Sequence, residues 1–194
     1  MEDEKREIRN IESALTAPDE EKRTVEGYAI LFNTKSDGLS FEEVIEAGAL
    51  EGVIERSDVF ALLNHDKYRG ILARSKRGVG SLTLSVDKKG LRYTFDAPKT
   101  ALGDELLENI RRGEIDESSF AFDVESDTWE KKKDGTWKRT IHQIGSLYDV
   151  SPVYSAAYSK TSVYMRGKEE AEAKAKSIEE RMPESYYENL LTNY

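Results

Sequence analysis

Histidine is the side chain whose ordinary pKa suits general-base catalysis near neutral pH, and this sequence has two, His65 and His142. An isolated histidine is more often structural than catalytic, so its position along the chain must decide between the two interpretations. His65 follows the apolar run Val59–Leu63, where a titratable group is costly to bury without a purpose. His142 lies on the return strand of a charged hairpin, where an outward-facing polar residue needs no special explanation. We therefore interpret His65 as the candidate base and His142 as structural.

The sequence contains no cysteine, which limits the covalent chemistry open to the chain. A thiolate nucleophile, a disulfide framework and a cysteine-based zinc site are all excluded, and a reducing cytoplasm fits this composition. Acyl transfer would then need a serine or threonine that a base activates. We expect neither a cofactor nor a metal.

Two adjacent serines, Ser118 and Ser119, are the candidate nucleophiles. Successive side chains of a strand point to opposite faces, so Ser118 shares a face with Phe120 and Phe122, and Ser119 shares the other with Ala121. The two phenylalanines can then fill the core while the hydroxyl of Ser119 faces a cleft. Alternation favours Ser119 over Ser118. The residues alone nevertheless favour the interpretation that both serines only end the loop after the helix, and nothing in the spacing of residues 65 and 119 forces them into contact.

A third group should orient the base, and a carboxylate is the usual choice. Asp66, Asp123 and Asp149 compete for this role. Asp66 adjoins His65, so on an extended strand its side chain would point the opposite way. Asp149 sits between apolar residues on an expected buried strand, where an unpaired carboxylate would be expensive and an imidazole partner would remove that cost.

The elements that must position these residues are mostly strands. Strand patterns cover Val25–Asn33 and Val59–Leu63, and the turn Asp87–Gly90 joins two alternating runs into a hairpin. A helix is expected over Ala101–Arg112, with Thr100 as N-cap and Gly113 just past its end. The remaining expected elements are a helical turn at Glu51–Glu55 and strands at Ser118–Glu130, Thr136–Ser146, Leu147–Val153 and Thr161–Met165.

Composition bounds the domain organisation and the partners. The 194 residues suffice for one catalytic domain, which we place at residues 24–166 between a charged N-terminal arm (1–23) and a charged helical tail (167–194). The net charge of -9 argues against a nucleic-acid groove, because phosphate binding needs clustered Lys and Arg. No signal-peptide pattern and no long apolar stretch occurs, so we expect neither export by that route nor a membrane partner.

Taken together, these residues resemble the tailed-phage prohead serine protease family, whose fold is similar to that of the herpesvirus protease assemblin. The likeness spans roughly residues 24–166 in family order, which is more specific than a single short motif. The family patterns Asn-His-Asp and Ser-Phe-Gly-Phe carry the catalytic histidine and the nucleophile. The matching segments here are Glu26–Asn33, Phe41–Ala49, Asn64–Asp66, Ser119–Phe122 and Leu147–Ser151.

The resemblance implies a triad of Ser119 as nucleophile, His65 as base and Asp149 as the third member, with His142 as the alternative third member in a Ser-His-His arrangement like that of assemblin. It selects Ser119 independently of strand alternation. It also implies an α+β fold with a mainly antiparallel, β-barrel-like core and flanking helices.

The sequence departs from the family pattern in three places. Ala121 stands where the family has glycine, Ala73–Ser75 replaces Gly-Arg-Thr, and Ala156–Tyr158 replaces Pro-Ala-Tyr. The first two lie close to the expected site, so the oxyanion hole is expected to differ in shape. None of them removes a proposed catalytic group.

The implied function is a serine endopeptidase that cleaves the scaffolding segment of the major capsid protein and other internal prohead proteins during capsid maturation. Self-cleavage near the chain ends is implied as well, inside the assembling prohead in the host cytoplasm, and a homodimer is compatible with it. The alternative is a catalytically inactive assembly or scaffolding protein on the same fold, whose charged ends would serve as interaction arms.

Overall fold

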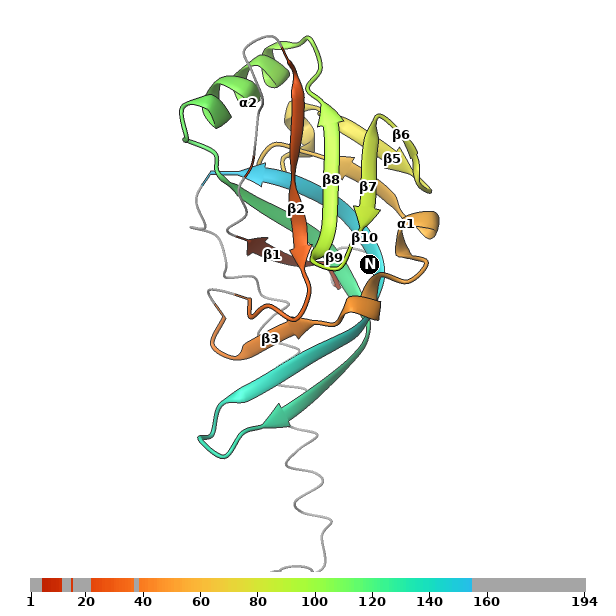
Figure 1. Cartoon of the computed structure of the whole chain (residues 1–194), viewed down its shortest axis with the longest axis vertical. Helices are drawn as coiled ribbons and strands as arrows, with labels where there is room; N and C mark the ends of the chain where they lie inside the picture. The colour runs from red at the N-terminus through yellow and green to blue at the C-terminus, as the bar shows by residue number, and fades with distance from the viewer. Residues whose placement is uncertain (1–4, 12–14, 16–21, 37–38, 155–194) are drawn as a thin grey trace, which may run out of the picture. The chain divides into compact units, whose positions relative to one another are not determined.

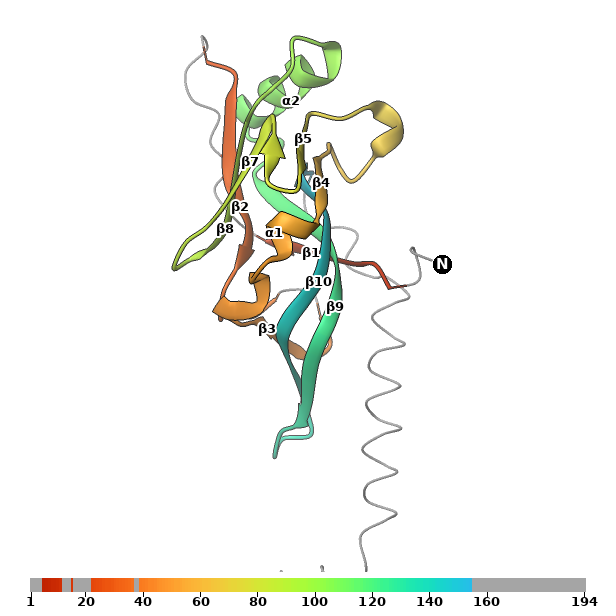
Figure 2. The ribbon, with the colours of Figure 1, turned by 90° about the vertical axis from the view of Figure 1, so that its right-hand side faces the viewer.

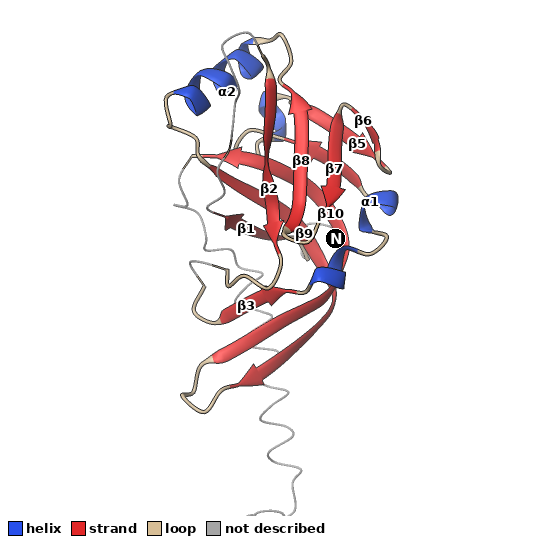
Figure 3. Ribbon diagram, in the orientation of Figure 1, coloured by secondary structure: helices blue, strands red, loops and turns tan. Residues whose placement is uncertain are grey.

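Strands arranged in two sheets make up most of the structure (Figure 1). The computed structural model describes residues 5–11, 15, 22–36 and 39–154, all within one unit of the chain that ends at Ser159. Figure 3 shows how few of these residues are helical. The helices are α1 (Val53–Arg56) and α2 (Ala101–Arg111), with short 3-10 turns η1 (Ala47–Leu50) and η2 (Lys67–Arg69). The strands are β1 (Glu7–Ile11), β2 (Thr24–Leu31), β3 (Glu42–Ile45), β4 (Asp58–Ala61), β5 (Ala73–Lys76), β6 (Val79–Gly80), β7 (Leu82–Val86), β8 (Gly90–Asp96), β9 (Glu117–Lys131) and β10 (Trp137–Val153).

The larger sheet is centred on the long hairpin of β9 and β10. Its strand order is β1-β9-β10-β4-β5-β6, and β3 also pairs with β10. The hairpin turns at Asp134 and Gly135, where Gly135 takes the positive φ of 84° that glycine adopts without steric cost. β10 runs parallel to both β3 and β4, so the sheet is mixed rather than purely antiparallel.

The smaller sheet has the order β2-β8-β7 and packs against the larger one (Figure 2). Its β7–β8 hairpin is confirmed as predicted: the carboxylate of Asp87 accepts hydrogen bonds from the backbone N–H groups of Lys89 and Gly90 and so closes the turn. Apolar side chains of both sheets form one core, including Ile30, Tyr93, Phe120, Phe122 and Ile141.

Helix α2 covers one end of this core. The hydroxyl of Thr100 accepts a hydrogen bond from the N–H of Gly103, which confirms the predicted N-cap. Leu106, Leu107 and Ile110 are buried on one face of the helix. Gly113 follows its end with a φ of 71°, a conformation that favours glycine.

The α+β class is confirmed, with differences in detail. The described strands form two separate sheets and not one closed barrel. The expected strands 136–146 and 147–153 are a single strand, β10, whose pairing with β9 is interrupted by register shifts between Ile141 and Asp149. Five residues of the expected N-terminal arm form β1 at the edge of the larger sheet.

Several expectations fall outside the described residues: the strand at 161–165, the departure at 156–158 and the helical tail at 167–194. Within the described part of the chain, no helix is both long and apolar enough to cross a bilayer.

Candidate active site

Three neighbouring strands bring the candidate residues together. Ser119 lies on β9, Asp149 on the adjacent β10, and His65 follows β4, which pairs with β10 on its other side. The chain after β4 stays attached to β10, because the N–H of Asn64 donates to the carbonyl of Pro152 at 3.0 Å. Asp149 and Ser119 thereby lie beside the ring of His65, although they are 84 and 54 positions away from it in the sequence.

The ring of His65 lies between the other two side chains. Its Nδ1 is 2.6 Å from Oδ1 of Asp149, and its Nε2 is 2.6 Å from Oγ of Ser119. The side chain of Ser119 is buried, whereas that of His65 is partly exposed. A nucleophile, a base and a carboxylate in this order are the arrangement by which serine proteases activate a hydroxyl group.

Asp149 is buried and has partners on both carboxylate oxygens. Ser151 donates its hydroxyl hydrogen bond to Oδ1 at 2.7 Å, and Arg6 donates from its guanidinium to Oδ2 at 2.5 Å. Burial alone would raise the pKa of Asp149, but the hydrogen bond and charge of His65, followed by its other partners, outweigh burial and hold the pKa below its ordinary value of 3.8. Asp149 is therefore ionised near neutral pH and must accept a hydrogen from Nδ1 of His65.

The competing carboxylates have other partners. Asp66 accepts a hydrogen bond from the N–H of Tyr68 and begins the turn η2. Asp123 accepts from the hydroxyl of Tyr148 at 2.6 Å and from the N–H of Ser146 at 2.9 Å. Neither carboxylate contacts His65 among the described interactions.

The competing histidine and serine are also engaged elsewhere. The ring nitrogens of His142 contact Glu46 and Thr128, each at 2.9 Å. Ser118 is buried on the opposite side of β9 from Ser119, where its hydroxyl is 2.8 Å from that of Tyr93. The structure thus brings His65, Ser119 and Asp149 together and leaves His142 and Ser118 outside the cluster.

Comparison with known protein families assigns the chain to a family. Residues 9–176 match the family model of the caudovirus prohead serine proteases. The chain belongs to this family. A prohead protease acts within the assembling capsid, and that location applies to this chain.

Other comparisons add little to the family assignment. A solved structure, the bacteriophage T4 capsid assembly protease gp21, is similar to this chain with a TM-score of 0.47 and 12% sequence identity, over 78% of this chain and 99% of gp21. No curated protein matches the chain at a significant level.

The nucleophile candidate is covered, which sequence alternation did not predict. Ser119 is 0% exposed, although we expected its hydroxyl to face an open cleft. The reason is β1, which pairs antiparallel with β9 so that Asn10 lies opposite Ser119. The hydroxyl of Ser119 is also 2.9 Å from the backbone carbonyl oxygen of Arg9.

These contacts need more protons than a neutral histidine supplies. Nδ1 of His65 must carry a hydrogen, because its partner Asp149 is a carboxylate. The single hydroxyl hydrogen of Ser119 then has two acceptors, Nε2 of His65 and the carbonyl of Arg9. All three contacts are hydrogen bonds only when the imidazole carries both hydrogens, and in that form it cannot take a proton from serine. A working site therefore requires β1 to move away or the imidazole to lose a proton.

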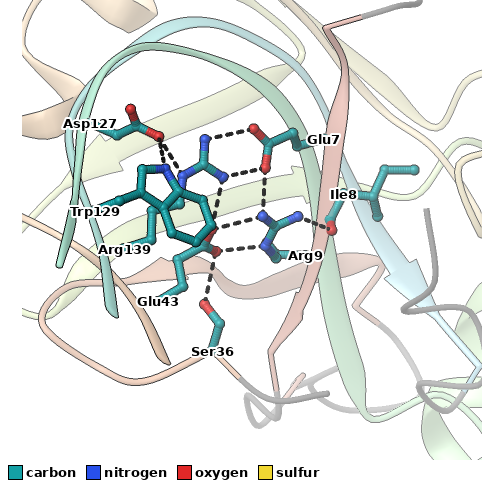
Figure 4. Close-up of polar contacts among 8 residues, drawn as sticks. All are labelled: Glu7, Ile8, Arg9, Ser36, Glu43, Asp127, Trp129 and Arg139. Carbon is teal, nitrogen blue, oxygen red and sulfur yellow. Dashed lines mark hydrogen bonds and ion pairs between the residues drawn. The ribbon is translucent and has the colours of Figure 1, made fainter. Parts of the chain in front are cut away.

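Residues that the sequence did not single out complete the surroundings of the site. Arg6 contributes its ion pair to Asp149, and Glu7 and Arg9 enter a buried charged cluster beside the site (Figure 4). The Glu-x-Arg order of Glu7 and Arg9, with both side chains on one face of a strand, is the signal that could have drawn attention to them.

Proposed function

We propose that this prohead protease is a serine endopeptidase in which Ser119 is the nucleophile, His65 the general base and Asp149 the residue that orients the imidazole. The observation that carries the proposal is the pair of 2.6 Å contacts that joins the ring of His65 to Ser119 and to Asp149. Family membership supports the same roles, because a serine and a base that activates it are the usual groups of a serine protease.

In the first half of the reaction, Oγ of Ser119 attacks the carbonyl carbon of a peptide bond, and its proton passes to Nε2 of His65. Asp149 stabilises the resulting imidazolium through Nδ1, and backbone N–H groups stabilise the oxyanion. The C–N bond then breaks as the imidazolium gives its proton to the leaving amine. The acyl group remains on Ser119.

In the second half, water attacks the acyl carbon and gives a proton to His65. The bond between the acyl carbon and Oγ breaks, and the imidazolium returns the proton to Ser119. The carboxylic acid product leaves, and the enzyme is restored to its starting state.

The proposed substrates are the scaffolding segment of the major capsid protein, other internal prohead proteins and the chain itself. Family membership supports the first two, since a prohead protease meets these proteins in the assembling capsid. Self-cleavage is supported by β1, whose Arg9–Asn10 peptide bond is the one next to the hydroxyl of Ser119.

Co-expression with the major capsid protein of the same genome tests the proposal, with both proteins followed by intact mass. The wild-type chain and the matched control Ser118→Ala are expected to shorten the capsid protein, whereas Ser119→Ala and His65→Ala leave it full length. A capsid protein that stays full length with every variant would instead indicate an assembly protein without turnover. Equal shortening by Ser119→Ala would reject Ser119 as nucleophile.

A further inference from the structure

Strand β1 occupies the edge of β9 in the way that a bound peptide strand would. Residues Glu7 to Ile11 pair antiparallel with Phe122 to Ser118, and strand addition of this kind is a common mode of peptide recognition. The hydroxyl of Ser119 donates to the carbonyl oxygen of Arg9 at 2.9 Å, so the Arg9–Asn10 peptide group lies at the proposed nucleophile. If Ser119 cuts this peptide bond, Arg9 is the residue just before the cut.

The side chain of Arg9 ends in a buried cluster of charged side chains (Figure 4). Its Nε and Nη2 donate to the two carboxylate oxygens of Glu43 at 2.6 and 2.8 Å, and its guanidinium lies over the ring of Phe122 at 5.6 Å. Glu43 comes from β3 and is 0% exposed. Two parallel N–H···O bonds are the geometry by which a carboxylate selects arginine.

Glu7 lies two residues before Arg9 and therefore on the same face of β1. It accepts two hydrogen bonds from Arg139 of β10, at 2.7 and 2.9 Å. Arg139 is fixed from its other side by Asp127, whose carboxylate accepts from Nε at 2.6 Å. Burial alone would raise the pKa of Glu7, but the bond from Arg139 and the nearby positive charges outweigh it and hold the pKa below its ordinary value of 4.5.

The cluster divides into two complementary halves. The domain supplies Glu43, Asp127 and Arg139, and β1 supplies Glu7 and Arg9. Buried ion pairs gain little stability over apolar packing, because desolvation offsets most of their attraction, but they reject a partner with the wrong charge strongly. When β1 leaves, the half that remains includes the carboxylate of Glu43 and the guanidinium of Arg139, which lie 3.1 Å apart.

We propose that Glu43 and Arg139 determine the cleavage specificity of this protease. On a substrate strand that takes the place of β1, Glu43 binds a basic side chain at the residue before the cut bond. Arg139 binds an acidic side chain two residues earlier. The substrate class is thus an extended Glu-x-Arg segment. This inference rests on the proposed function, since it assumes that Ser119 cuts the bond it faces.

Peptide cleavage by the full-length chain tests this specificity. The probes are a peptide of residues 3–14 and the same peptide with Arg9→Ala, and mass spectrometry locates and times the cut. The wild-type chain is expected to cut the native peptide after Arg9 at least about tenfold faster than the Arg9→Ala peptide, because the latter removes both hydrogen bonds that the arginine donates to Glu43. The ratio of the cleavage rates of the two peptides should fall to near one with Glu43→Gln.

Glu42→Gln is the matched control, because Glu42 is the neighbour of Glu43 on β3 but pairs with Lys132 outside the cluster. It should keep the wild-type preference. Labelling of Ser119 by a fluorophosphonate, followed in parallel, reports the nucleophile independently of peptide choice and shows that each variant is folded.

The outcomes separate the two claims. Cutting without preference, a preference that survives in Glu43→Gln, or labelled protein that cuts no peptide would overturn the specificity proposal alone. Wild-type protein that neither cuts a peptide nor labels at Ser119 would overturn the proposed function and the specificity with it.

Discussion

His65 and the residue before it adopt a backbone conformation that most side chains avoid. Asn64 has a φ of 58° and His65 a φ of 59°, both in the left-handed region. Asparagine tolerates this region better than most residues, and the turn directs the imidazole back toward β9 and β10. Such strain persists at sites where the surrounding structure fixes a side chain for a task.

Substitution of Asn64 should reveal this strain. Its side chain is exposed, so a change acts mainly through the backbone. Asn64→Ala is expected to lower the free energy of unfolding by about 1–2 kcal/mol, whereas Asn64→Gly should leave it unchanged or raise it. Urea unfolding of the three proteins measures the difference. Equal stability of Asn64→Ala and Asn64→Gly would contradict the assigned conformation.

The depressed pKa of Glu7 predicts a pH dependence of stability. A carboxylate whose folded pKa lies below its ordinary 4.5 stabilises the protein above that pH, and this contribution is lost as the pH falls through the folded pKa. Glu7→Gln should cost about 3 kcal/mol at pH 7 and should lose less stability than the wild type on acidification below about pH 4.5. Chemical unfolding at several pH values tests this, with the exposed Glu108→Gln as control. Parallel curves for wild type and Glu7→Gln would refute it.

The residues of the site differ in how well the sequence predicts them. Ser119 follows from strand alternation and from the family motif, and Asp149 from the cost of an unpaired buried carboxylate. Arg6, Glu43 and Arg139 carry no comparable signal, because their partners depend on the register of β1 against strands more than a hundred residues away. Local pattern cannot supply a long-range register.

At the scale of elements, locally encoded structure is the part that sequence predicts best. The β7–β8 hairpin and helix α2 carry their own turn and capping residues, and both form where expected. The continuity of β10 is not visible in the sequence, since bulges between Ile141 and Asp149 replace the break that the pattern indicates. The pairing of β1 with β9 is likewise not visible in the local sequence pattern.

Helix α2 offers a test in which packing opposes propensity. Helix propensity alone predicts that Gly103→Ala stabilises by about 1 kcal/mol. A Cβ atom at this position would however lie 2.1 Å from the carbonyl oxygen of Pro98, so we expect a loss of about 1–3 kcal/mol instead. Thermal and urea unfolding measure the sign, and the exposed Glu108→Ala in the same helix should be nearly neutral. A stabilised Gly103→Ala would show that this approach is not tight.

At the scale of the whole molecule, one strand of the N-terminal segment both completes the larger sheet and covers the nucleophile. The same Glu-x-Arg order occurs again in the sequence of the tail, at Glu179–Arg181, outside the described residues. If Glu43 and Arg139 bind Glu-x-Arg segments, the tail contains a second cleavage site.

Self-processing of the tail should then occur after Arg181. Active protein is expected to lose residues 182–194, while Arg181→Ala stays uncut there and the matched control Arg166→Ala, which has no acidic residue two positions earlier, is cut as usual. Intact mass resolves all of these products. Equal trimming of Ser119→Ala would assign the cut to another protease, and a cut of the active protein at a different bond within residues 167–194 would contradict the specificity.

Covalent labelling of the serine shows whether His65 activates Ser119. The full-length chain is treated with a fluorophosphonate, and the labelled residue is located by peptide mass, with time allowed for β1 to leave the site. We expect a label on Ser119 in the wild type and in Ser118→Ala, none in Ser119→Ala, and a large loss of labelling rate in His65→Ala. An unlabelled Ser119 in the wild type, or equal labelling of Ser119 in His65→Ala, would contradict this activation.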